Sequence, residues 1–114
     1  MNNAGVLAEQ LAAQYLQRQG LKLLQINYRC RFGEIDLILQ DGDTLVFAEV
    51  RLRSSSAFGG AAASIDARKQ AKLVRTAQHY LSRLNHIPPC RFDAILMQSV
   101  DSPAIEWVKN AFSL

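Results

Sequence analysis

A turn between two alternating segments constrains this chain more than any other feature. Residues 34–40 carry apolar side chains at every second position, and residues 45–53 do the same. The sequence Asp41-Gly42-Asp43 between them is typical of a tight β-hairpin turn. Because successive side chains of a strand point to opposite faces, each strand should have one apolar and one charged face. We therefore expect a hairpin whose apolar face packs on the core.

The charged faces of this hairpin gather two acids and a guanidinium. Asp36 lies on the first strand, and Glu49 and Arg51 lie on the second. If the charged faces coincide, the two carboxylates become neighbours, although the sequence does not fix the register. Two ionised carboxylates ~4 Å apart repel by about 4 kcal/mol at an effective dielectric constant near 20. The pair needs a compensating cation, which is either a divalent metal ion or the Arg51 guanidinium.

Hydrophobic periodicity predicts the remaining elements. We expect helices at 4–19 and 64–86, and further strands at 21–31, 91–97 and 105–108. Ser64 is the expected N-cap of the second helix, Pro88 follows its end, and Leu84 belongs to its buried stripe. The last strand is short and follows Pro103, which favours a sheet edge. This order of elements predicts an α/β sandwich with a mixed central sheet flanked by helices.

Length and composition predict a single domain over residues 1–114, with 49% hydrophobic and 20% charged residues. No apolar run approaches the ~18 residues of a membrane helix, and the first residues lack the pattern of a secretory signal. We therefore expect a cytoplasmic protein with no membrane partner. Cys30 and Cys90 are far apart and have no C-x-x-C spacing. Neither a disulfide nor a zinc site is expected from them.

The positive charge of the chain is concentrated in one region. The formal net charge is +3, but residues 51–75 contain six basic residues and one acid, so the rest of the chain sums to −2. A regional basic patch attracts phosphate backbones. The candidate backbone-binding residues are Arg53, Arg68, Lys72 and Arg75. A solvated helix face is the alternative explanation for them.

Aromatic and histidine side chains give weaker indications of function. Phe58, in the small-residue segment 54–63, is a candidate for stacking on a nucleic-acid base, whereas Tyr28 and Phe32 are expected to pack in the core. His79 and His86 lack the spacing of metal ligands. We expect neither histidine to be a ligand or a general base.

Two further charged residues on the helices complete the set of candidates. Glu9 lies about 20° from Leu16 around the first helix, on its apolar side, at 100° per residue. Burial of a lone carboxylate is costly, so Glu9 should pair with an arginine or contact a cation. Lys69 lies one turn before Leu73, at the border of the buried stripe. From there it could reach the sheet face that carries Arg51.

The succession of these motifs resembles the YraN family of small bacterial proteins. The resemblance extends from Gly5 to Asp93 and includes both strands of the hairpin. The motifs that carry it are Gly5 and Glu9, Asn27-Tyr28-Arg29, Gly33-Glu34-Ile35-Asp36-Leu37-Ile38, Phe47-Ala48-Glu49-Val50-Arg51, Phe58-Gly59, Ile65 with Lys69, Ala77 with Tyr80-Leu81, and Arg91-Phe92-Asp93.

That family is regarded as a branch of the PD-(D/E)xK nuclease-like superfamily, similar in fold to archaeal Holliday-junction resolvases and restriction endonucleases. The resemblance implies a three-layer restriction-endonuclease-like sandwich and a DNA endonuclease acting on branched or single-stranded DNA. It also implies Mg²⁺ or Mn²⁺ held by Glu9, Asp36 and Glu49. A homodimer is plausible by the same resemblance. The catalytic set would be Asp36, Glu49, Arg51 and Lys69.

One residue departs from the superfamily pattern. The lysine expected two residues after the second acid is Arg51, which stabilises negative charge but cannot lose its proton at ordinary pH. Three outcomes follow. The metal-bound water needs no side-chain base, Lys69 supplies the missing lysine, or activity is lost. In the last case the chain is a nucleic-acid-binding module or a protein-interaction subunit.

Overall fold

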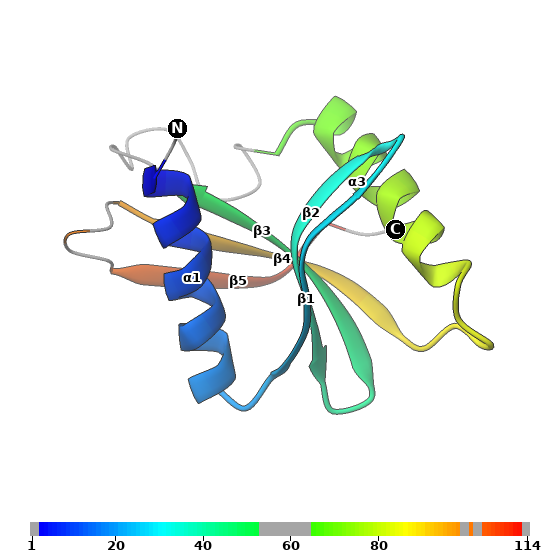
Figure 1. Cartoon of the computed structure of the whole chain (residues 1–114), viewed down its shortest axis with the longest axis horizontal. Coiled ribbons are helices and arrows are strands. Elements are labelled where there is room, and N and C mark those ends of the chain that lie inside the picture. The colour runs from blue at the N-terminus through cyan, green and yellow to red at the C-terminus, as the bar shows by residue number, and fades with distance from the viewer. Residues whose placement is uncertain (1–2, 53–64, 99–100, 102–103, 113–114) are drawn as a thin grey trace.

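The computed structural model describes residues 3–52, 65–98, 101 and 104–112, and within them seven helices and strands (Figure 1). One mixed sheet has the strand order β1-β2-β3-β4-β5, in which β3 and β4 are parallel and the other neighbours are antiparallel. The expected α/β class is therefore confirmed. The elements are α1 (Asn3–Arg18), β1 (Lys22–Cys30), β2 (Gly33–Asp41), β3 (Thr44–Leu52), α3 (Ala67–Leu81), β4 (Cys90–Met97) and β5 (Ile105–Phe112).

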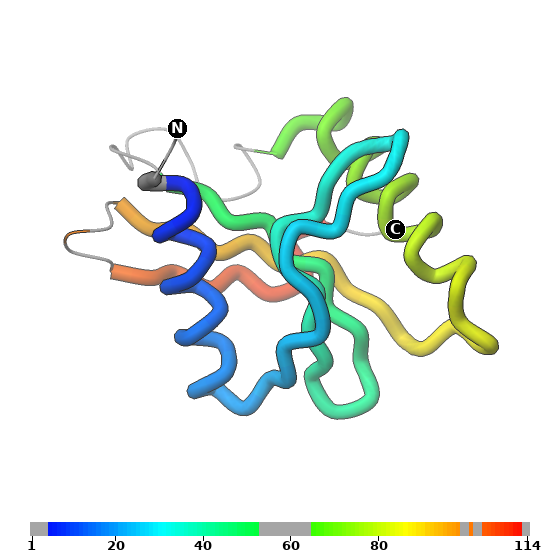
Figure 2. Tube along the Cα trace, viewed as in Figure 1, coloured from blue at the N-terminus to red at the C-terminus, as the bar shows by residue number. Residues whose placement is uncertain are grey.

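Each face of the sheet has its own hydrophobic core. On β3, Leu45 and Phe47 pack in the cluster that contains the α3 residue Leu73. Val46 and Ala48 alternate with them and pack in the cluster that contains Leu16 of α1. Because side chains alternate across a strand, α1 and α3 cover opposite faces of the sheet (Figures 1 and 2). The arrangement is helix, sheet, helix.

The face of the β2–β3 hairpin that was expected to be charged is only partly charged. This corrects the expectation of one apolar and one charged face. Ile38 and Phe47 occupy that face and are buried in the α3 cluster. The prediction from the sequence rested only on the alternating apolar positions of these strands. The strands are covered on both faces, and such strands are nearly continuously apolar. The charged part is therefore confined to the end of the hairpin that holds Asp36, Glu49 and Arg51.

The turn of the hairpin follows the prediction from the sequence, and the structure gives the register that the sequence left open. Asp41 pairs with Thr44, so that Gly42 and Asp43 form a two-residue loop, and Gly42 has a φ of 61°. This left-handed conformation is the one that glycine adopts without steric cost. Farther along, Leu37 pairs with Ala48. One more step in this register brings Asp36 opposite Glu49.

The limits of α3 differ from the expected helix at 64–86. Its N-cap is Asp66, whose carboxylate accepts a hydrogen bond of 2.9 Å from the Lys69 backbone N–H. Ser64, the expected cap, lies outside the described residues. The helix ends at Leu81, after which the Leu84 N–H bonds back to the Leu81 carbonyl at 3.0 Å. Such three-residue bonds tighten a helix end, and Leu84 becomes 39% exposed instead of joining the buried stripe.

Three other expectations concern β5, the membrane and the cysteines. The last strand lies at the sheet edge as expected, but it runs to Phe112 and is longer than the predicted 105–108. Within the described segments, no helix has the length and apolar character to cross a membrane. Cys30 and Cys90 are free thiols.

Candidate functional site

Asp36 and Glu49 form a close carboxyl pair at the end of the β2–β3 hairpin. The Val50 N–H donates a 2.8 Å hydrogen bond to Asp36 Oδ2, and Glu49 is only 6% exposed. Burial and the neighbouring charge of Glu49 raise the pKa of Asp36 to about 8, although the Val50 hydrogen bond opposes the shift. Two carboxyls in one desolvated site cannot both ionise easily. The pair therefore retains a proton near neutral pH.

Two cations face the same oxygen of Glu49. Lys69 Nζ lies 3.1 Å from Glu49 Oε2, and Arg51 Nη2 lies 3.6 Å from it. Lys69 thus reaches the sheet face that carries Arg51, as its place on the helix indicated. The N-cap at Asp66 fixes the first turn of α3 and so sets where the Lys69 side chain starts. Asp36 and Glu49 are accompanied by positive charge even without a metal ion.

Glu9 lies half-buried on α1, and its charge makes a smaller contribution to the raised pKa of Asp36. Across the ranges that the structure describes, no three Asp, Glu, His or Cys side chains are grouped so that they could hold a metal ion. Asp36 and Glu49 alone are a two-carboxylate set, which Mg²⁺ accepts when waters or substrate phosphates complete its shell. The role of Glu9 as a ligand stays a prediction.

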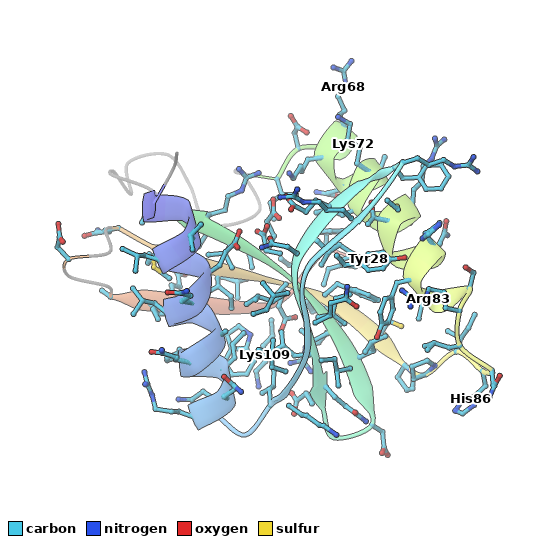
Figure 3. The ribbon with its side chains drawn as sticks, viewed as in Figure 1. Tyr28, Arg68, Lys72, Arg83, His86 and Lys109 are labelled. Carbon is cyan, nitrogen blue, oxygen red and sulfur yellow. The ribbon has the colours of Figure 1, made fainter. Side chains whose placement is uncertain are left out.

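The predicted backbone-binding residues of α3 lie on its exposed side. Arg68, Lys72 and Arg75 are at least partly exposed, and Figure 3 shows Arg68 and Lys72 on the N-terminal half of the helix. Their placement leaves both explanations open, phosphate contacts or a solvated face. Arg53 and Phe58, the other two candidates, lie outside the described residues.

The aromatic residues near α3 divide into a core group and an outer group. Tyr28 is 4% exposed, as expected, and its hydroxyl is 2.5 Å from His79 Nδ1. Phe32 was expected in the core as well, but it lies between β1 and β2 at the hairpin tip and is only partly buried. A two-strand connection runs over the surface, so an aromatic residue there packs on one side only.

A buried ionic network around Asp93 was not identified from the sequence as a structural feature. Asp93 is 1% exposed and accepts hydrogen bonds from Arg91 Nε at 3.0 Å, Trp107 Nε1 at 2.9 Å and the Asn110 N–H at 2.9 Å. Arg91 also bonds to Asp41 at 2.9 Å. The network joins β4 to β5 and to the hairpin turn. An acid inside the apolar run of β4 was the signal that could have revealed it.

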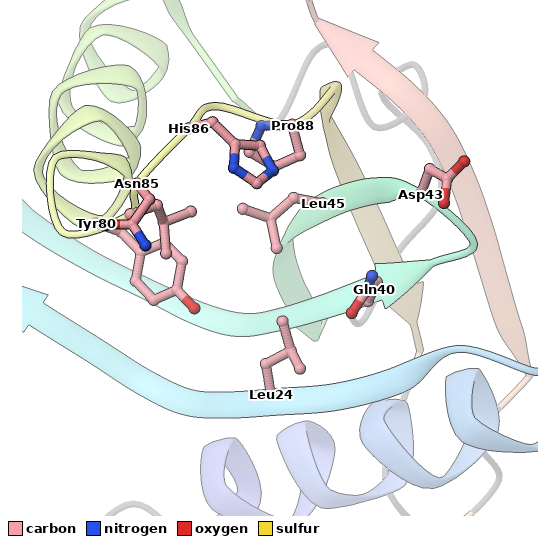
Figure 4. A pocket seen from close by; sticks show the side chains of 9 residues that line it. Leu24, Gln40, Asp43, Leu45, Tyr80, Asn85, His86 and Pro88 are labelled. Carbon is pink, nitrogen blue, oxygen red and sulfur yellow. The ribbon is translucent and has the colours of Figure 1, made fainter.

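The pocket in Figure 4 lies at the turn end of the hairpin, away from Asp36 and Glu49. Its volume is about 320 Å³, and it lies between the first three strands and the end of α3 with the segment that follows. None of the candidate catalytic or metal-binding residues lines it. Its lining residues are Leu24, Gln40, Asp43, Leu45, Tyr80, Leu84, Asn85, His86 and Pro88.

Comparison with known proteins identifies a family for this chain. A model of "Uncharacterised protein family UPF0102" matches residues 8–97. A UPF0102 protein of Nitrosomonas europaea is 60% identical over 110 residues, covering 96% of this chain and 93% of the relative. A UPF0102 protein of Methylobacillus flagellatus is 56% identical over 113 residues, covering 99% of each chain. The chain therefore belongs to the UPF0102 family, which is the YraN family.

Proposed function

We propose that this protein is a metal-dependent endonuclease of restriction-endonuclease-like fold that hydrolyses phosphodiester bonds in branched or single-stranded DNA. The observation that carries the proposal is the Asp36–Glu49 pair, accompanied by two cations at the end of a basic helix. Chemistry of this class needs a site for a divalent ion and positive charge for the phosphate oxygens. Residues on β2, β3 and α3 offer groups for both requirements.

The donor set of the pair fits Mg²⁺ or Mn²⁺. Asp36 and Glu49 would hold the ion directly, and Glu9 on α1 would add its negative charge near the ion. The ion would supply charge neutralisation at the scissile phosphate and lower the pKa of a bound water. Burial and then the charge of Glu49 raise the pKa of Asp36 to about 8, so ionising both carboxyls needs more positive charge at the site. A divalent cation provides that charge.

Lys69 and Arg51 would act on the substrate phosphate. Both lie within 4 Å of Glu49 Oε2, so they would stand beside a phosphate held by a metal ion at Asp36 and Glu49 and could stabilise the negative charge that develops on it. Arg51 stays protonated and can only donate hydrogen bonds and charge. Lys69 is the residue of the pair that can also exchange a proton. It therefore takes the role of the lysine that the superfamily pattern places at Arg51.

A second candidate function is nucleic-acid binding without hydrolysis. Glu49 already has two cationic partners, which can satisfy its charge without a metal ion. In that case the acid pair is structural, and the exposed basic residues of α3 carry the function. A homodimer is compatible with either candidate.

A cleavage assay separates the two candidates. Labelled branched and single-stranded DNA is incubated with the wild type and Mn²⁺, and then with Asp36→Asn and Lys69→Met. We expect cleavage by the wild type and a loss of at least about 100-fold in each variant, because the groups act as one unit. Asp43→Asn is the matched control, since this exposed acid lies in the hairpin turn away from the pair.

The assay can reject the nuclease proposal in two ways. Cleavage that persists in Asp36→Asn shows that the acid pair does not perform it. Salt-sensitive DNA binding without any cleavage in Mg²⁺ or Mn²⁺ favours the binding module instead.

A further inference from the structure

The tip of the β1–β2 hairpin packs directly beside α3 (Figures 1 and 2). Gly33 has a φ of 150°, and a Cβ at this position would lie 3.1 Å from Thr76 Oγ1 and 3.9 Å from Lys72 Cβ. Glycine therefore permits the close approach. The adjacent Phe32 ring meets the His79 ring in an edge-on contact, with 6.2 Å between centroids. Residues remote in sequence thus form one continuous surface.

A row of basic side chains runs along α3 beside this tip. We call it the basic stripe. Spacings of three or four residues keep its four helical members within an arc of about 60°, and the last residue follows the helix end. In the described ranges, none of its arginine or lysine side chains forms an ion pair with a carboxylate. The basic stripe consists of Arg68, Lys72, Arg75, His79 and Arg83, three of which are labelled in Figure 3.

The length of the basic stripe matches several nucleotides. The fifteen intervals from Arg68 to Arg83 correspond to about 22 Å at a rise of 1.5 Å per residue, of which the part up to Leu81 is helical. One strand of duplex DNA carries one phosphate per about 3.4 Å of axis, so a single strand stacked in the same way would place at most about six phosphates along the stripe. Positive charge over this length fits a polyanionic backbone better than a compact anion.

The hairpin tip adds a planar surface at the side of the basic stripe. The guanidinium carbon of Arg31 lies 4.9 Å from the centroid of the Phe32 ring. Arg31 is exposed and Phe32 is partly buried. Guanidinium planes and aromatic rings are the groups on which unpaired bases stack. Arg29 differs, because Glu34 holds its guanidinium in a 2.5 Å ion pair.

We propose that Arg31 and Phe32 stack an unpaired base of single-stranded nucleic acid while the basic stripe contacts its phosphates. A base inside a duplex has both faces covered by its neighbours, so this surface selects single strands. The inference rests on the proposed function, because it defines which nucleic acid approaches the acid pair. Asp36 follows Phe32 by four residues, about 13 Å along β2. The stacked base therefore lies within a few nucleotides of Asp36 and Glu49.

The test measures binding without catalysis. Fluorescence anisotropy in EDTA compares a labelled single strand with a duplex of the same sequence and length. We expect the wild type to bind the single strand more tightly. Phe32→Leu should weaken single-strand binding about 5- to 100-fold and duplex binding less than about twofold, because one stacking contact is lost. Phe32→Tyr keeps the aromatic face and should bind as the wild type does.

The basic stripe is tested by its salt dependence. Lys72→Gln should weaken binding of both nucleic acids and reduce the slope of log K against log salt by about 0.9 for the duplex and 0.7 for the single strand. Arg18→Gln is the matched control, since Arg18 is exposed at the end of α1 on the opposite side of the sheet. It should leave both affinities and both slopes unchanged.

Two results would overturn the inference. One is a wild type that binds the duplex more tightly than the single strand. The other is a Phe32→Leu variant whose affinity falls equally for both nucleic acids or for neither. If Phe32→Leu does not fold, Arg31→Gln makes the same comparison at an exposed residue. EDTA removes divalent metal ions, so the binding test does not depend on cleavage. If the wild type prefers the single strand in this test but cleaves no DNA in the Mn²⁺ assay, only the nuclease proposal is rejected. Cleavage with an unaffected Phe32→Leu variant rejects only the stacking surface.

Discussion

Lys69 Nζ lies 3.1 Å from Glu49 Oε2, so the first turn of α3 is joined to the charged end of β3. The carboxylate is almost buried, whereas the lysine side chain is 40% exposed. A buried carboxylate needs such a partner because an uncompensated charge is costly in a desolvated site. The position of α3 therefore determines whether Glu49 in the candidate site has a lysine partner.

Replacing Lys69 by methionine should lower the free energy of unfolding by about 1–2 kcal/mol. Glu49 then retains Arg51 at 3.6 Å, and the exposure of Lys69 reduces the effect below that of a fully buried pair. Urea denaturation at pH 7 measures the change. Lys72→Met, on the same helix and exposed, should change the stability by less than about 0.5 kcal/mol. Equal effects of the two variants would contradict the structural role of Lys69.

Stability should fall as pH rises toward 8 because of Asp36. Its folded-state pKa of about 8 is above the unfolded value near 4, so the folded state binds more protons between these limits. The stabilisation by this proton is complete below pH ~4 and is lost as pH rises through 8. Its total is on the order of a few kcal/mol, and it belongs to the Asp36–Glu49 pair together.

Urea denaturation of Asp36→Asn at pH 5 and pH 8.5 tests that linkage. The wild type should lose stability between the two values, and the variant should lose much less, because its amide does not titrate. Asp43→Asn, which removes an exposed acid, should keep the wild-type slope. Parallel slopes for wild type and Asp36→Asn would show that Asp36 ionises normally.

Asp93 should be the acid whose removal costs most stability. Asp93→Ala removes the acceptor of the Trp107 and Asn110 N–H groups and leaves Arg91 with Asp41 alone, for an expected loss of about 3–5 kcal/mol. Trp107 is the single tryptophan of the chain, so its fluorescence reports unfolding at β5. Asp101→Ala, at an exposed position, is the control. A loss below about 1 kcal/mol would contradict the network.

Gly33 should not tolerate a side chain. Its φ of 150° and the 3.1 Å approach of Thr76 Oγ1 make Gly33→Ala both strained and crowded. Gly20→Ala is the comparison, since Gly20 has a φ of 99° but no atom within 4 Å of the point that an added methyl group would occupy. Thermal unfolding should therefore show a lower Tm for Gly33→Ala than for Gly20→Ala. The reverse order would place the hairpin tip away from α3.

Local pattern was sufficient to predict the fold class, except where distant residues decide the outcome. The Asp41-Gly42-Asp43 turn and the alternation around it led to the correct hairpin. The end of α3 and the length of β5 were wrong. Hydrogen bonds of the turn after Leu81 determine where α3 ends. The hydrogen bond from the Asn110 N–H to Asp93 supports the longer β5. Neither is visible as periodicity.

The candidate site was predictable in part for the same reason. Asp36 and Glu49 share a hairpin, so a single register brings them together. Lys69 could be placed because helix geometry fixes its side relative to Leu73. The surface of Phe32 and His79 escaped the sequence because it depends on how the hairpin tip packs on a helix more than thirty residues later.

Calorimetric titration of Mn²⁺ and Mg²⁺ into the wild type and Glu49→Gln tests the central claim most directly. The claim is that Asp36 and Glu49 together bind a divalent cation. We predict saturable binding to the wild type and a loss of at least about tenfold in affinity for Glu49→Gln, which keeps the size of the side chain but removes its charge. Equal binding by the two proteins, or no binding by the wild type, would contradict the claim.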